Sequence, residues 1–293
     1  MPSFTTHQPT FRILMLHGFA QSSERFQVKA RLIVEQFTTD LLPKILPEYP
    51  GGLEYIFPDA PFRFGSDSEE SSGLESRAWW LNLDDFSKYV GLENTLVRLS
   101  ESLNGQPIHA AVGFSQGGAL AAMITALCDA STNNVRRNML AAQGLPVDTF
   151  LRNLPGQQPL KFVVCVSGFR GTMKYYSGFY KQTITTPSMH IIAALDTMIP
   201  EEKSLDLIAA FKNPEVIHHA GGHYIPRDRV LLRRVGDFVR SVFEDKVERP
   251  TRDTVATDLR PPVGVKSRSV SPSAKHQFMR RRVRSIVQSS RIR

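Results

Sequence analysis

Five residues near the middle of the chain have the spacing of a catalytic serine. Gly113-Phe114-Ser115-Gln116-Gly117 follows an apolar, strand-like run and precedes an Ala- and Leu-rich run typical of a helix. In a strand–turn–helix of this kind the serine lies in a tight, strained turn, and the flanking glycines remove side chains that would clash. The hydroxyl then stands clear of the sheet at the start of the helix. The pattern predicts a nucleophilic serine at position 115.

A serine hydroxyl is a poor nucleophile at neutral pH, so it needs a histidine base and a carboxylate that orients the base. In a strand–turn–helix of this kind the chain order is Ser, acid, His. His223 follows Ala220-Gly221-Gly222, whose flexibility lets an imidazole reach back over the sheet edge. It is favoured over His219, which ends a strand-like run. Asp196 directly follows an apolar run and is favoured over Asp206, which falls in an expected helix.

Stabilising the charge on an attacked carbonyl requires two backbone N–H donors. We expect one from Gln116, the residue after the serine, and the other from Phe19, in the loop after the first strand. Trp79 and Trp80 follow a Ser-rich loop, where they either line an acyl pocket or pack in the core. This chemistry implies no metal ion and no organic cofactor.

These side chains need a scaffold of alternating strands and helices. Apolar runs predict strands over 12–16, 53–57, 108–114, 162–166, 189–195 and 216–219. Helical spacing predicts helices over 28–37, 90–103, 119–130, 204–211 and 228–243. The alternation predicts an α/β fold with a mostly parallel, doubly wound sheet. A polar loop is expected over 58–76, and two short lid insertions, over about 131–160 and 170–186, are expected near the ligand-binding edge of the sheet.

Composition limits the class of protein. The 293 residues are 41% apolar and 22% charged, which excludes collagenous, fibrous and wholly disordered chains. The net charge is +8, but 248–293 holds 12 Lys or Arg and 3 Asp or Glu, a net of +9 that leaves −1 for 1–247. We therefore expect a folded domain over 1–247 without a nucleic-acid partner, and a basic, disordered tail over 248–293.

The tail and the apolar runs bear on location. Met279, Val283, Ile286 and Val287 share one helical face among arginines. A solvated extension is favoured there over contact with an anionic membrane. No apolar stretch has the length of a signal-peptide core or a membrane span, so a cytoplasmic location is expected.

Several motifs together resemble one known family. They are Leu16-His17-Gly18-Phe19, Asp59-Ala60-Pro61, Ala78-Trp79-Trp80, Gly113 to Gly118, Ser167-Gly168-Phe169, Asp196 to Pro200 and His219 to Pro226. Their order over about residues 10–245 is similar to the fungal family of serine hydrolases, to which the mammalian ovarian-cancer-associated hydrolase belongs. The resemblance implies an α/β-hydrolase fold with Ser115, Asp196 and His223 as its triad. The chain departs from the pattern at Ala193, where the family commonly has a glycine.

The resemblance also suggests a reaction. Fungal members resemble esterases, or thioesterases that release a polyketide from its synthase in secondary metabolism. We therefore expect hydrolysis of a small-molecule carboxylic ester or acyl thioester, the thioester being presented on a carrier protein. Acyl transfer to an alcohol or amine on the same triad is an alternative, because pocket shape and water exclusion select the acceptor. A non-catalytic protein recruited by its basic tail is the rival from another class.

Overall fold

The main sheet has six strands. The computed structural model describes residues 8–64, 76–82, 89–171 and 176–244. The strands of this sheet are β1 (Phe11–Leu16), β2 (Leu53–Ile56), β7 (Ala110–Phe114), β8 (Phe162–Val166), β9 (Ser188–Ala193) and β10 (Glu215–His219). They pair in the order β10-β9-β8-β7-β1-β2, and every neighbouring pair is parallel.

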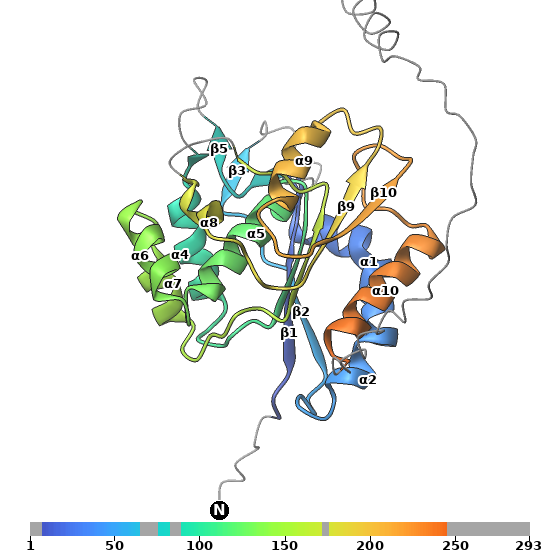
Figure 1. The fold of residues 1–293 in the computed structure, drawn as a ribbon, viewed down its shortest axis with the longest axis horizontal. Helices are drawn as coiled ribbons and strands as arrows, with labels where there is room; N and C mark the ends of the chain where they lie inside the picture. Colours follow the sequence, from blue (N-terminus) through green and yellow to red (C-terminus); the bar gives the residue numbers. More distant parts are fainter. Residues whose placement is uncertain (1–7, 65–75, 83–88, 172–175, 245–293) are drawn as a thin grey trace, which may run out of the picture. The chain divides into compact units, whose positions relative to one another are not determined.

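Helices cover both faces of this sheet (Figure 1). One face packs against α1 (Ser23–Asp40), α2 (Leu42–Ile45) and α10 (Arg229–Val242). The other face packs against α4 (Leu92–Ser102), α5 (Gln116–Asp129), α7 (Val147–Asn153), α8 (Gly178–Lys181) and α9 (Glu201–Ile208), with α6 (Asn134–Ala142) outside them. The predicted doubly wound α/β fold is confirmed.

The burial of the strands explains their composition. In β1, Leu14 and Leu16 point into the core beneath α5, whereas Phe11, Ile13 and Met15 point into the core beneath α1 and α10. Successive strand side chains alternate between faces, so a strand covered on both sides is apolar at nearly every position. The exception in β1 is Arg12, whose Nε donates to Glu54 Oε2 at 3.1 Å. This burial on both faces is the reason that apolar runs marked the strands in the sequence.

Three expectations differ from the structure or fall outside it. The stretch 58–76, expected as a loop, contains β3 (Phe62–Phe64), which pairs with β4 (Ser76–Ala78). A second short pair joins β5 (Leu81–Asn82) to β6 (Tyr89–Val90). The domain boundary after 247 and the basic tail over 248–293 lie outside the described residues. No helix in the part of the chain that the structure describes is long and apolar enough to cross a membrane.

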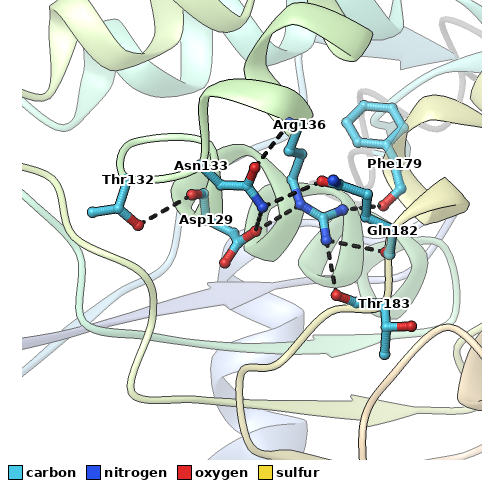
Figure 2. Close-up of polar contacts among 7 residues, drawn as sticks. All are labelled: Asp129, Thr132, Asn133, Arg136, Phe179, Gln182 and Thr183. Atoms are coloured by element: carbon cyan, nitrogen blue, oxygen red, sulfur yellow. Dashed lines mark hydrogen bonds and ion pairs between the residues drawn. The ribbon is translucent and has the colours of Figure 1, made fainter.

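The insertion over 131–160 is fixed by a buried arginine (Figure 2). The side chain of Arg136, on α6, is 1% exposed, and its Nε donates to Asp129 Oδ2 at 2.6 Å. The two terminal nitrogens donate to the carbonyl oxygens of Phe179 at 2.9 Å, Gln182 at 3.0 Å and Thr183 at 3.1 Å. One guanidinium therefore ties α6 to the end of α5 and to the segment around α8.

Candidate active site

The turn between β7 and α5 places Ser115 at the carboxyl end of the sheet. Ser115 has φ +54° and ψ −117°, a left-handed conformation that costs about 1–3 kcal/mol for a residue with a side chain. A Cβ at Gly113 would lie 2.0 Å from the carbonyl oxygen of Gly117, and one at Gly117 would lie 2.2 Å from that of Leu16. Only glycine fits either position, as the spacing predicted.

His223 and Asp196 meet this serine. His223 Nε2 lies 2.9 Å from Ser115 Oγ, and His223 Nδ1 lies 2.7 Å from Asp196 Oδ2. An ionised carboxylate only accepts hydrogen bonds, so Nδ1 carries the proton and Nε2 is left to accept the serine hydroxyl. The imidazole also packs on the ring of Phe114, with 4.8 Å between ring centroids. The arrangement is that of a nucleophile, a base and a group that orients the base.

Asp196 is held as an anion. It follows β9, its side chain is 6% exposed, and its Oδ1 accepts the amides of Met198 at 2.9 Å and Ile199 at 2.8 Å. Burial alone would raise the pKa of this carboxyl. The hydrogen bonds from His223 and from the two amides outweigh burial and lower the pKa below its ordinary value. The carboxylate is therefore charged at neutral pH and can stabilise an imidazolium.

The competing residues lie elsewhere. His219 ends β10, and its Nδ1 accepts a hydrogen bond from the amide of Gly221 at 3.2 Å, not from the hydroxyl of Ser115. Its Nε2 is buried and has no hydrogen-bond partner among the described residues, and burial lowers the pKa of the ring. Asp206 is exposed on α9. Of the candidates weighed from the sequence, His223 and Asp196 are the two that the fold brings to the serine.

Both expected N–H donors border the same cavity as Ser115. Gln116 is the first residue of α5, where helix geometry offers the amide no intrahelical acceptor and the helix dipole favours negative charge. Phe19 lies in the loop after β1, with half of its surface exposed. Its neighbour His17 is fully buried: Nδ1 donates to the Gly18 carbonyl at 2.8 Å, and Nε2 accepts the Ala60 amide at 3.1 Å. Burial lowers the pKa of His17, so a neutral imidazole anchors this loop.

The two tryptophans have different roles. Trp80 lines the cavity and packs on Tyr89, with 4.9 Å between ring centroids. Trp79 does not border the cavity. Its indole is buried, and its Nε1–H donates to the His17 carbonyl at 2.8 Å. Of the two alternatives drawn from the sequence, core packing holds for Trp79, because the hydrogen bond keeps its ring in the core, and the tentative place in the pocket holds for Trp80 alone.

Sequence reasoning missed the side chain of Gln116. Its Oε1 accepts the Trp79 amide and its Nε2 donates to the Trp80 carbonyl, each at 2.9 Å. The residue after the nucleophile thus fixes the backbone of the segment that supplies one cavity wall. The only signal was the polar residue itself at the buried start of an apolar helix.

The cavity has a volume of about 1290 Å³. That exceeds the range of roughly 300–1,000 Å³ typical of small-molecule sites. Aromatic side chains form part of its wall, and four cationic side chains also line it: Lys29, Arg170, Lys203 and Arg227. No described residue between 131 and 160 lines it, so the expected contribution of that insertion to the pocket is not found. Arg170 and Gly171 of the second insertion do line it.

The fold and the site define a class. A parallel sheet with helices on both faces carries a serine, an aspartate and a histidine after β7, β9 and β10, in that chain order. This is the arrangement of an α/β hydrolase. Comparison with known proteins goes one step further. The chain belongs to the family described as Serine hydrolase (FSH1), whose family model matches residues 6–235.

Curated relatives cover most of the same region. Esterase OVCA2 of Danio rerio is 29% identical over 252 residues, which is 78% of this chain and 96% of that protein. Esterase CG5412 of Drosophila melanogaster is 29% identical over 247 residues, 81% of this chain and 76% of that protein. The solved structure of Zea mays acyl-protein thioesterase 2 matches with a TM-score of 0.48 and 18% identity, covering 82% of this chain and 96% of that chain.

Proposed function

We propose that this serine hydrolase cleaves a carboxylic ester or an acyl thioester through an acyl-enzyme on Ser115. The observation that carries the proposal is the continuous hydrogen-bonded path from Ser115 Oγ through His223 to Asp196, open to a large cavity. The names of the curated relatives, which are esterases, support the same reaction class.

The first half-reaction follows from the proton positions. Ser115 Oγ attacks the carbonyl carbon while His223 Nε2 takes the hydroxyl proton. Asp196 stabilises the imidazolium that forms, and the N–H groups of Gln116 and Phe19 hold the oxyanion. The tetrahedral intermediate then collapses, the C–O or C–S bond breaks, and His223 gives its proton to the departing alcohol or thiol.

The second half-reaction repeats these steps with water. His223 Nε2 takes a proton from a water molecule, whose oxygen attacks the acyl carbon. The bond to Ser115 Oγ breaks, and His223 returns a proton to the serine. The products are a carboxylic acid and the free enzyme, so atoms and charge balance without a further reactant.

Labelling by a fluorophosphonate probe tests the nucleophile. The wild-type chain should be labelled and Ser115→Ala should not. Ser167 provides a matched control because it also has a positive φ, of +46°, at a strand end, yet it is buried and its hydroxyl has no partner in the part of the chain that the structure describes. Ser167→Ala should therefore be labelled like the wild type. Labelling of Ser115→Ala would refute the proposal.

Within this reaction we also propose a carrier-bound acyl thioester of a polyketide pathway as substrate. The resemblance to the fungal family and the size of the cavity support it. Turnover of a panel of acyl esters and acyl-pantetheine thioesters tests it, with a preference for the thioesters as the expected result. The cytoplasmic location stays a prediction, which cell fractionation tests.

A further inference from the structure

The cavity in front of Ser115 is lined by more positive than negative charge. Its cations are Lys29, Arg170, Lys203 and Arg227, and Asp228 is the one carboxylate that lines it in the described ranges. Among described residues, none of the four cations forms an ion pair with a carboxylate. A substrate that carries only neutral groups would not require this excess of positive charge.

Lys29 and Arg227 reach the cavity from separate elements. Lys29 lies on α1, and Arg227 lies between His223 and the start of α10. Arg25, one turn before Lys29 on the same helix, adds a third positive charge beside them. Burial lowers the pKa of Lys29, and the charges of Arg25 and Arg227 lower it further. Cations that repel one another in this way are stabilised by a bound anion.

Two other charged groups of the cavity, Arg170 and Asp228, are already engaged. The guanidinium of Arg170 lies over the ring of Tyr180, 5.0 Å from its centroid. Asp228 caps α10, where its Oδ1 accepts the amides of Val230 at 2.9 Å and Leu231 at 3.0 Å. Its charge is directed at the helix N-terminus. Lys203 lies on α9, where its carbonyl accepts the amide of Arg170 at 3.0 Å. Of the lining cations other than Arg170, Lys29 and Arg227 are the two whose charges act on one another, so we take them as the pair that a ligand would meet.

We propose that Lys29 and Arg227 bind an anionic group, a phosphate or a carboxylate, on the substrate whose carbonyl Ser115 attacks. The inference rests on the proposed function and names its substrate class. A guanidinium matches the paired oxygens of either anion, and an ammonium adds a point charge. The volume of about 1290 Å³ leaves room for such a group beside an acyl chain.

Binding measured by calorimetry tests the site independently of turnover. The probes are thioethers that cannot be hydrolysed. One pair is hexyl-pantetheine and hexyl-4′-phosphopantetheine, and in the second pair a carboxylate at the end of the alkyl chain of the pantetheine thioether replaces the terminal methyl group. At low salt the anionic member of at least one pair should bind about tenfold more tightly to the wild-type chain. Which pair shows the preference identifies phosphate or carboxylate as the group.

The double variant Lys29→Gln/Arg227→Gln should lose most of that preference while binding the neutral probes as before. The matched control, Lys212→Gln/Arg233→Gln, removes two exposed charges that do not line the cavity and should keep the preference. Equal affinity of the wild type for both members of both pairs would overturn the proposal. So would an unchanged preference in the Lys29/Arg227 variant, or a loss of equal size in the control.

Labelling separates this inference from the function on which it rests. The control variant Lys212→Gln/Arg233→Gln should react with a fluorophosphonate probe as fast as the wild type, because neither residue lines the cavity. A wild-type chain that binds the anionic probe but shows no Ser115-dependent labelling would refute the proposed function and leave the anion site standing. The reverse result would refute the anion site alone.

Discussion

Replacing Arg136 should destabilise the fold more than any exposed substitution while leaving the chemistry of the site intact. Its side chain is 1% exposed and donates to one carboxylate and three carbonyl oxygens. None of these partners lines the cavity. The side chain of Asp129 is 12% exposed, and in Arg136→Ala the one donor to its carboxylate that remains among the described residues is Asn133, at 3.3 Å.

The magnitude follows from what is left behind. Removing one partner of a buried ion pair typically costs about 3–5 kcal/mol, because the remaining charge stays desolvated. Each orphaned buried carbonyl adds roughly 1–3 kcal/mol unless water reaches it. Water that enters the space of the lost side chain can hydrate some of these carbonyl oxygens. We therefore expect the free energy of unfolding to fall by about 3–5 kcal/mol, the cost of the unpaired carboxylate.

Urea unfolding followed by fluorescence measures this loss, with the buried Trp79 and Trp80 as reporters. Arg137→Ala is the matched control: Arg137 lies next in sequence and pairs with Asp148 at 2.6 Å, but the two side chains are 42% and 53% exposed. Its loss should stay within about 1 kcal/mol, since exposed ion pairs contribute little.

A second variant tests the cause of the loss. Arg136→Met/Asp129→Leu removes both charges and should be more stable than Arg136→Met alone, because no uncompensated carboxylate remains. A loss below about 1 kcal/mol for Arg136→Ala, or strictly additive effects in the double variant, would refute the reasoning. The folded fraction of Arg136→Ala should still react with the fluorophosphonate probe.

Three other results follow from the geometry. Asp196→Asn should lower kcat by about four orders of magnitude, because the amide fails to hold the His223 tautomer; steady-state kinetics measure the loss, and a melting curve checks that the variant is folded. Gly117→Ala should lower the melting temperature and abolish labelling, whereas Gly222→Ala, whose added Cβ meets nothing nearer than 3.5 Å, should keep the melting temperature. His190 is buried, and burial lowers its pKa from 6.5 to about 4. Between pH 6.5 and about pH 4 the imidazole is therefore protonated in the unfolded chain and neutral in the folded chain. The free energy of unfolding should fall by up to about 3 kcal/mol over that interval, and His190→Leu should remove this part of the fall in urea titrations.

Much of the scaffold was readable from local pattern. Strands buried on both faces are apolar at most positions, and α5 combines many apolar residues with a start at the predicted turn. The sequence missed the helices α6 and α7 in the insertion over 131–160 and several very short elements. β3 has three residues and pairs with β4 across a stretch of chain, so no period of hydrophobicity marks it. The family assignment agrees with the resemblance found from ordered motifs.

The sequence could not distinguish the positions of two adjacent residues of the same type. Trp79 and Trp80 are both 1% exposed, yet one lies under the loop after β1 and the other forms cavity wall. Which ring points inward depends on the partners that Gln116 and His17 offer from distant parts of the chain. Arg136 gave no signal for the same reason: its acceptors, on 179–183, are remote in sequence.

The catalytic serine and the proposed anion-binding residues differ in how clearly the sequence reveals them. Ser115 needs a left-handed backbone and close approach of β1 to α5, and these demands force glycine at Gly113 and Gly117. The nucleophilic serine can therefore be recognised in the sequence by the glycines that its backbone requires. Lys29 and Arg227 need only to carry charge at surface positions whose backbone is ordinary, so nothing in their neighbours distinguishes them from solvated cations. A site that depends on strained backbone can therefore be predicted from a single sequence. The proposed selection of an anionic substrate cannot, because it depends on the fold bringing α1 beside the loop that follows His223.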